Sequence, residues 1–411
     1  MLDIGLIREN PKEFAAALKK RDSQIELGAL LELDEQRREL LQQVEGLRAK
    51  QNTAAKAQDI ESGRELKEQL KDLEPRLKAT EMALGEALLP LPNIPHDSVP
   101  AGEKGDREVV HEWGEKPEFG FAFKNHVELG EALGILDFDR AATIAGAQFP
   151  LYIGDGALLE WALISFMFRH QVFSNGYTPV IPPHLMSGAS ALAHTTLPKF
   201  AEDVYYVEKD DLYLIPTAEA ALVNMHRDEI IDEAELPKRY TAYTPCYRRE
   251  AGSYGAKERG LVRVHQFNKV EVVRFVKPAE SWSALEEMAR EAEEVVEALG
   301  FHYHTTNLVA SDVSFAMAKT YDIEVWLPGQ DAYYEVSSAS NGTDFQARRA
   351  GTRYRPAGGG KAEFVHILNA SGLATSRLMV ALLECGQQED GSVVVPEVLR
   401  EYVGKDVITP R

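Results

Sequence analysis

The stretch YRREAGSYGAKERGLVRVHQFNKVE, residues 247–271, is the part of the chain from which the architecture is best predicted. It is typical of two strands joined by a glycine-rich loop. Because residues i and i+2 of a strand point to the same face, Arg248 and Glu250 are predicted to share one face of the first strand. One parity of the return strand holds Arg263, Phe267 and Glu271. This combination of two cations, two anions and an aromatic ring suits a nucleotide site, although a solvated strand face remains the alternative.

The composition limits the class of protein. A chain of 411 residues is long enough for two or three domains, one of them with a large core. With Cys246 and Cys385 as its cysteines, the sequence predicts no disulfide framework and no zinc site, and we expect a cytoplasmic location. Residues 1–21 are too charged for a secretory signal, and the apolar run 158–173 is too short to span a bilayer, so no membrane partner is expected.

The charge distribution is uneven. A net charge of -20 disfavours promiscuous binding of nucleic acid, but a shaped docking surface needs only local Lys and Arg residues. Two basic clusters meet that need: Arg248, Arg249, Lys257, Arg259 and Arg263 form one, and Arg348, Arg349, Arg353, Arg355 and Lys361 form the other.

The N-terminal part carries leucines at heptad spacing. One row is Leu33, Leu40 and Leu47, and a second is Leu70, Leu77 and Leu84. Such rows predict an antiparallel helical coiled coil over about residues 28–90, with a turn near residues 62–63. A projecting arm is favoured over two helices packed flat on a core, because the remaining faces are charged. Prolines then mark a linker, so residues 1–100 are predicted to be an arm with its linker.

Residues 101–411 alternate short strands with helices. Hairpins follow one another, and an amphipathic helix is expected over residues 282–299 before Gly300. The predicted fold class is therefore α+β, an antiparallel sheet flanked by helices. No GxGxxG or GxxxxGK[ST] phosphate loop is present.

Six further segments, in order, complete a pattern: LPKF (197–200), LYLIPTAEAAL (212–222), KTYDIEVWLP (319–328), EVSSASN (335–341), DFQARR (344–349) and LNASGLATSR (368–377). Together with residues 247–271, which resemble motif 2, they are similar to the class II aminoacyl-tRNA synthetases, and in detail to the bacterial seryl-tRNA synthetase family. The resemblance covers nearly the whole chain. It implies a class II catalytic domain over residues 101–411 and an N-terminal arm that binds tRNA.

The resemblance implies activation of L-serine with ATP and transfer of serine to the 3′ end of tRNA(Ser), and also of tRNA(Sec). The N-terminal arm would bind the long variable arm of the tRNA, and residues 252–260 would contact its acceptor end. Residues 176–183, GYTPVIPP, resemble motif 1, a helix running into a strand, which implies a homodimer.

The resemblance also implies an ATP site. Arg248 would touch the α-phosphate and the serine carboxylate, and Arg377 and Phe267 would enclose the adenine. Glu335 and Ser338 would hold Mg²⁺ against the phosphates, and Arg248, Arg377 and Glu335 would be the catalytic residues. The ATP-binding set so implied is Arg248, Arg249, Glu250, Arg263, Val264, Phe267, Glu335, Val336, Ser337, Ser338 and Arg377.

The implied serine pocket consists of Thr217, Ala218, Glu219, Arg248, Glu271, Asn369 and Ser371. Thr217 and Glu219 are expected on one strand face. Alanine would leave a buried carboxylate and a hydroxyl unpaired, which can give discrimination on the order of 10⁴.

Some positions depart from the family pattern. The arm is short, and Pro75 falls inside its second helix, where proline is costly. Two other functions therefore stay open: a paralogue that passes an activated amino acid to a carrier protein, and a non-catalytic protein that resembles synthetases.

Overall fold

The computed structural model describes residues 1–23, 25–251 and 260–410. This part of the chain divides into two compact units, Met1–Ile94 and Pro95–Arg411. The assignment of residues 1–100 and 101–411 as functional domains stays a prediction. Within the described chain, we find no helix that is both long and apolar enough for a membrane span.

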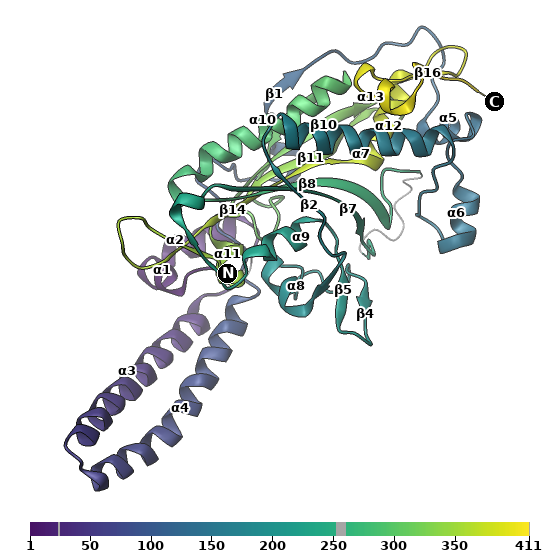
Figure 1. The fold of residues 1–411 in the computed structure, drawn as a ribbon. Coiled ribbons are helices and arrows are strands. Elements are labelled where there is room, and N and C mark those ends of the chain that lie inside the picture. The colour runs from purple at the N-terminus through teal and green to yellow at the C-terminus, as the bar shows by residue number, and fades with distance from the viewer. Residues whose placement is uncertain (24, 252–259, 411) are drawn as a thin grey trace. The chain divides into compact units, whose positions relative to one another are not determined.

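The first unit is helical (Figure 1). Its elements are α1 (Ile4–Glu9), α2 (Pro11–Lys20), α3 (Gly28–Lys56) and α4 (Ile60–Leu88). The predicted heptad rows lie along the seam of α3 and α4, where Val44, Leu70 and Leu77 are buried. Arg48 of α3 also pairs with Glu74 of α4 at 2.7 Å. The helices are therefore antiparallel neighbours, as the spacing predicts.

The predicted position of the turn is wrong. Residues 62–63 lie inside α4, and the chain reverses before Ile60 instead. Asp59 is the N-cap, and its carboxylate accepts a hydrogen bond from the backbone N–H of Ser62 at 3.1 Å. A capping aspartate satisfies backbone donors that no intrahelical partner reaches, so it starts a helix more effectively than Ser-Gly interrupts one.

The second unit is built on an eight-stranded sheet, ordered β1-β9-β10-β11-β14-β8-β7-β2. All neighbours are antiparallel except β2 and β7. The strands are β1 (Glu108–Trp113), β2 (Thr178–Val180), β7 (Lys238–Tyr247), β8 (Gln266–Val276), β9 (Tyr303–Asn307), β10 (Lys319–Leu327), β11 (Ala332–Asn341) and β14 (His366–Ala374). This confirms the predicted α+β class.

Helices cover both faces of this sheet (Figure 1). One face packs against α7 (Asp155–Phe173), α10 (Ser281–Leu299) and α12 (Thr375–Gly386), whose apolar residues join Val270 and Ile323 in the main core. The opposite face packs Val273 and Phe275 against residues near α9 (Glu219–Leu222) and α11 (Phe345–Ala350). The predicted helix over residues 282–299 is confirmed, and Gly300 ends it in the left-handed conformation (φ 78°).

Smaller elements surround the main sheet. Three short sheets comprise β3 (Leu185–Ser187), β4 (Tyr206–Val207) and β5 (Leu212–Leu214); β6 (Ile230–Asp232), β12 (Arg353–Arg355) and β13 (Glu363–Phe364); and β15 (Val393–Val394) with β16 (Val407–Ile408). The remaining α-helices are α5 (His126–Ala132), α6 (Phe138–Ala145), α8 (Gly188–His194) and α13 (Glu397–Val403).

Two predictions about strands near the expected site are wrong. Pairing of β7 with β8 ends at Tyr247 and Gln266, so Arg248, Glu250 and Arg263 lie beyond the ladder. Strand parity therefore does not determine where their side chains point. Glu250 has a φ of 51°, a left-handed conformation that no strand contains. Thr217 and Glu219 also lie outside strands, because β5 ends at Leu214 and Glu219 begins α9.

Candidate active site

Most of the predicted site residues line two neighbouring cavities on the α9 side of the sheet. The larger cavity has a volume of about 550 Å³, and predicted residues on its wall are Thr217, Glu219, Arg248, Glu250, Arg263, Glu335, Ser338, Asn369 and Ser371. The second, of about 220 Å³, adds Val264, Phe267, Val336 and Arg377. Arg248, Glu250, Arg263, Glu335 and Ser371 contribute to both walls, so the two hollows share a border.

Four predicted residues line neither cavity. Ala218 and Ser337 are fully buried, and Ser337 instead donates to the carbonyl of Ser371. Glu271 is 1% exposed and reaches the site through its hydrogen bonds. The backbone N–H of Arg249 donates to the carbonyl of Asp203 at 2.8 Å. Lys257, Arg259 and the loop expected at the acceptor end lie mainly outside the described residues.

Arg248 sits at the end of β7 in a fixed setting. Its Nε donates to the carbonyl of Pro216 at 3.3 Å, and its guanidinium carbon lies 5.1 Å from the centre of the Phe267 ring. Its backbone N–H donates to the carbonyl of His265 at 2.9 Å. These contacts still leave a planar cation on the cavity wall, where a carboxylate or phosphate could bind it bidentately.

Two further arginines of the predicted set, Arg263 and Arg377, lie next to carboxylates. Arg263 pairs with Glu250 at 2.8 Å. Arg377, near the start of α12, donates through Nη1 to the carbonyl of Glu335 at 2.5 Å and lies 3.6 Å from its carboxylate. Arg377 also donates through Nε to the carbonyl of Val262 at 3.3 Å. The guanidinium groups are thus positioned before any ligand arrives.

Acidic side chains gather where β10 and β11 pair. Asp322 lies directly opposite Ser338 and accepts a hydrogen bond from it. Burial, and then the charge of Glu335, raise the pKa of Asp322 well above its ordinary value. Mg²⁺ prefers oxygen ligands, and a cation here would offset the negative charge of the carboxylates. The oxygens of Glu335, Ser338 and Asp322 therefore fit the ion. Sequence reasoning missed Asp322, although it shares the strand parity of Thr320 and Glu324.

The predicted serine pocket centres on Glu271 of β8. Thr217 donates to its Oε2 at 2.8 Å, and the Nζ of Lys269 forms an ion pair with the same oxygen. Lys269 also donates to the Oγ of Ser371 at 3.4 Å. Burial raises the pKa of Glu271, with Lys269 acting against that shift and Glu219 adding to it.

Glu219 has its own partners on the far wall. Gln346 donates to its Oε1 at 2.8 Å, and His194 lies 3.5 Å from its Oε2. Burial would raise the pKa of Glu219, but His194, Gln346 and Lys269 together lower it. His194 comes from α8 and Gln346 from α11, and no sequence signal marks either as a neighbour of Glu219. Lys269, by contrast, could have been found, because it shares the parity of Phe267 and Glu271.

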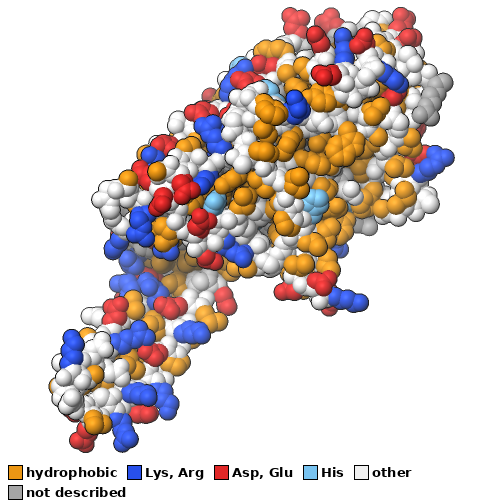
Figure 2. Space-filling model, in the orientation of Figure 1, with side chains coloured by type: hydrophobic (Ala, Val, Ile, Leu, Met, Phe, Trp, Pro, Cys, Tyr) orange, Lys and Arg blue, Asp and Glu red, His pale blue; other side chains and the backbone are white. Residues whose placement is uncertain are grey.

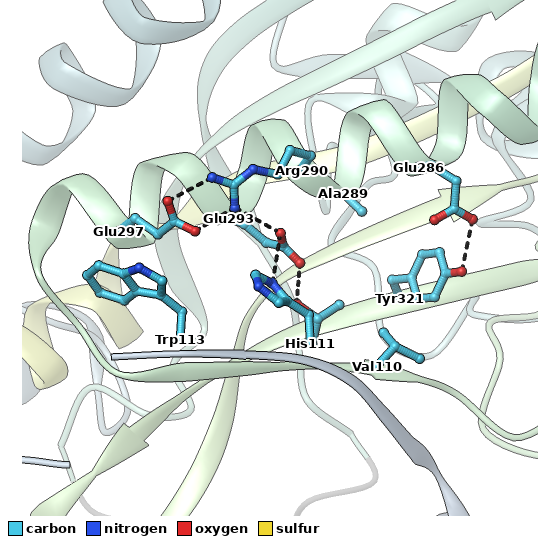
Figure 3. A pocket seen from close by; sticks show the side chains of 10 residues that line it. Val110, His111, Trp113, Glu286, Ala289, Arg290, Glu293, Glu297 and Tyr321 are labelled. Carbon is cyan, nitrogen blue, oxygen red and sulfur yellow. Dashed lines mark hydrogen bonds and ion pairs between the residues drawn. The ribbon is translucent and has the colours of Figure 1, made fainter. Parts of the chain in front are cut away.

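A third hollow, of about 610 Å³, lies between β1 and α10 and contains none of the predicted residues (Figure 3). Its charged side chains bind one another: Arg290 donates to Glu297 at 2.5 Å and to Glu293 at 3.2 Å. His111 lies 3.2 Å from Glu293. The network ties the edge strand to the helix, which is a structural role.

The described residues include no cluster of three or more His, Cys, Asp or Glu side chains that could hold a metal ion. An ion bound at Glu335 and Ser338 would therefore need ligands from outside the chain. Mg²⁺ ordinarily takes phosphate oxygens and waters in this way.

Comparison with known proteins identifies the fold and the family. Residues 204–385 match the family model "tRNA synthetase class II core domain (G, H, P, S and T)", and residues 1–95 match "Seryl-tRNA synthetase N-terminal domain". A serine–tRNA ligase of Syntrophobacter fumaroxidans is 49% identical over 98% of this chain and 99% of its own length. One from Geobacter sulfurreducens is also 49% identical, with the same coverage.

Solved structures agree with this match. Seryl-tRNA synthetase from Pyrococcus horikoshii, complexed with ATP, is 38% identical with a TM-score of 0.93, and the match covers 100% of both chains. Cytoplasmic serine–tRNA ligase from Naegleria fowleri, in complex with AMP, is 30% identical with a TM-score of 0.90, covering 100% of this chain and 99% of that one. The chain belongs to the seryl-tRNA synthetase family.

Proposed function

We propose that this chain is a serine–tRNA ligase that acts in the cytoplasm. It activates L-serine with ATP and transfers the seryl group to the 3′ end of tRNA(Ser) and of tRNA(Sec). The observation that carries the proposal is the shared border of the two cavities, where Arg248 lies between the Phe267 and Arg377 side and the Thr217 and Asn369 side. A nucleotide and an amino acid bound on the two sides would meet at Arg248. Relatives 49% identical over nearly the whole chain are serine–tRNA ligases.

In the first step an oxygen of the serine carboxylate attacks the α-phosphorus of ATP. The bond from that phosphorus to the α,β-bridging oxygen breaks, and pyrophosphate leaves. The two reactants are both anionic, so catalysis depends on fixed cations that bring them together. Arg248 binds the carboxylate and the α-phosphate, while Arg377 and Phe267 enclose the adenine. Arg249, Glu250, Arg263, Val264, Val336 and Ser337 complete the proposed ATP site.

Glu335 and Ser338 would hold Mg²⁺, with Asp322 supporting Ser338 from the opposite strand. The ion neutralises charge on the phosphates when it is bound. Burial raises the pKa of Asp322, and a nearby cation would favour its ionised form.

Serine is recognised by groups on the opposite side of Arg248. Glu271 and Ser371 bind the hydroxyl, Thr217 and Glu219 bind the amino group, and Ala218 and Asn369 complete the pocket. Glu219 is suited to the amino group, because its lowered pKa keeps the carboxylate ionised at neutral pH, where it can face a cation.

We also propose a homodimer. Large apolar side chains on and after α7 are exposed: Leu158 is 44% exposed, Trp161 58%, Phe173 73% and Ile181 93%. Figure 2 shows hydrophobic side chains gathered on this face of the second unit. Apolar patches of this kind mark interaction surfaces, and light scattering of the purified protein would test the dimer.

The test of the function is amino-acid-dependent ATP–pyrophosphate exchange with all twenty amino acids, followed by charging of tRNA(Ser) by the same preparation. We expect exchange with serine and charging. Exchange with serine but charging of a carrier protein alone would instead establish the paralogue, and lack of exchange with every amino acid would support a non-catalytic role.

A further inference from the structure

Lys269 is a lysine buried inside the proposed serine pocket. Its side chain is 8% exposed, although it belongs to the residue types that are almost never buried without a partner. It lies on β8 two residues before Glu271, so both side chains point to the same face of the sheet. It contributes to the walls of both cavities.

The contacts of Lys269 connect two strands. Its Nζ forms an ion pair with Oε2 of Glu271 and donates to the Oγ of Ser371 on β14 at 3.4 Å. Thr217 donates to the same Oε2 at 2.8 Å. Within the part of the chain that the structure describes, both donors to the Glu271 carboxylate use Oε2, and Oε1 accepts no hydrogen bond. One oxygen is therefore occupied, which fixes the carboxylate plane and leaves the other for a ligand.

The electrostatic setting makes the lysine necessary. Glu271 is 1% exposed, and a second carboxylate, Glu219, faces it from α9. The other groups that face Glu271 are Thr217, Ser371 and the buried thiol of Cys246 on β7, while Arg248 and His194 lie on the same cavity wall. Burial raises the pKa of Glu271, and Lys269 is the largest influence in the opposite direction. Without Lys269, Glu271 would bind a proton at higher pH.

We propose that Lys269 is a positioning residue for serine recognition, which keeps the Glu271 carboxylate charged and orients it, together with the Ser371 hydroxyl, toward the serine side chain. This inference rests on the proposed function and adds a residue that decides specificity. A charged acceptor binds the serine hydroxyl, and alanine offers it nothing. A protonated Glu271 would lose that preference.

The test compares Lys269→Met, which keeps the length of the side chain, with Lys269→Arg, which keeps the charge. Pyrophosphate exchange is measured with serine and with alanine, from pH 5.5 to 9. For Lys269→Met we expect kcat/KM for serine at pH 7 to fall about 10- to 100-fold, as for a lost hydrogen bond to a charged group. The KM for ATP should change less than about twofold, and the serine-to-alanine ratio should fall.

The pH profile separates this role from simple loss of packing. In Lys269→Met the acidic limb of kcat/KM for serine should move to higher pH, because Glu271 then loses its proton only at a higher pH. Lys269→Arg should restore most of the wild-type profile. Lys319→Met is the matched control: Lys319 has a 10% exposed side chain and its Nζ lies 3.9 Å from Glu286 of α10. It should leave the KM for serine and the pH profile unchanged.

Three outcomes would overturn the inference. One is an unchanged pH profile in Lys269→Met, and another is an equal loss for serine, alanine and ATP, which would indicate a packing role. In both cases serine-dependent exchange by the wild-type protein would leave the proposed function intact. The third is wild-type protein without serine-dependent exchange, which would remove the proposed function and this inference with it.

Discussion

Arg248 is placed by two neighbours that carry no charge, the ring of Phe267 and the carbonyl of Pro216. Its cation is therefore available to two anions that must approach each other. We expect Arg248→Ala to cost about 3 to 4 kcal/mol of transition-state stabilisation, a loss of about 10² to 10³ in kcat for activation. Arg248→Lys should recover little, because an ammonium cannot bind bidentately. Single-turnover formation of adenylate measures both, and near-normal rates in Arg248→Ala would remove it from the proposed role.

Glu160 of α7 gives the stability a pH dependence. It is buried, accepts a hydrogen bond from Asn268 at 2.7 Å and another from Thr375, and burial raises its pKa to about 7. In the unfolded chain its pKa would be near 4.5. Between these values the folded state holds a proton that the unfolded state has lost, so the free energy of unfolding falls as pH rises from about 4.5 to about 7.

The expected loss across that window is on the order of 3 kcal/mol for wild-type protein. Glu160→Gln cannot ionise and should remove this part of the slope, so the variant gains stability relative to wild type as pH rises. Urea unfolding at several pH values measures it. Parallel curves for the two proteins would show that Glu160 does not titrate in this range.

At the scale of single residues, the sequence predicts which residues line the site better than it predicts the local structure that brings them together. Phe267 and Glu271 share a face because β8 is a strand, as parity requires. Arg248, Glu250 and Arg263 do lie together, but beyond the end of the ladder, where an ion pair and a left-handed Glu250 place them. Such turns depend on contacts between distant segments. The partners of Glu219 from α8 and α11 depend on tertiary packing in the same way.

At the scale of elements, the heptad spacing predicts α3 and α4 because each apolar row needs a partner surface. The Ser-Gly pair misled the prediction of the turn because its residues are tolerated on an exposed helix, whereas Asp59 supplies a cap. Propensity is a weak guide beside a capping hydrogen bond and a continuous apolar seam.

Replacing Pro75 would measure how much unfavourable free energy the apolar packing between α3 and α4 offsets. Pro75 lies in the interior of α4, is exposed, and leaves the carbonyl of Lys71 without its usual donor. Pro75→Ala should stabilise the helix by up to about 3 kcal/mol, since it restores the donor and removes the ring. Hydrogen exchange by mass spectrometry on the full chain should show slower exchange in peptides from α4, by as much as two orders of magnitude. Peptides from α10 serve as the control, and unchanged α4 exchange would contradict the prediction.

At the scale of the whole molecule, the sheet follows from short hairpins separated by helices. The parallel pair β2 and β7 is possible because residues 181–237 connect the two strands, a crossover long enough to return the chain in the same direction. The order of strands does not follow from spacing, because β9, β10 and β11 must insert between β1 and β14. Periodicity carries no information on such long-range pairing, so the strand order is not predicted from the sequence.

We expect the two units to have separate functions, since every residue proposed for ATP and serine lies in Pro95–Arg411. Replacing residues 39–79 by a short glycine linker removes most of α3 and α4, but it keeps buried Asp34 with Arg8 and Arg37, paired at 2.6 and 2.8 Å. Serine-dependent pyrophosphate exchange should stay within about twofold of wild type, whereas charging of tRNA(Ser) should fall by at least 10², because contacts to the tRNA backbone are lost. Surviving charging would show that the arm does not read the tRNA. Loss of exchange as well would show that the arm is needed for the catalytic unit itself.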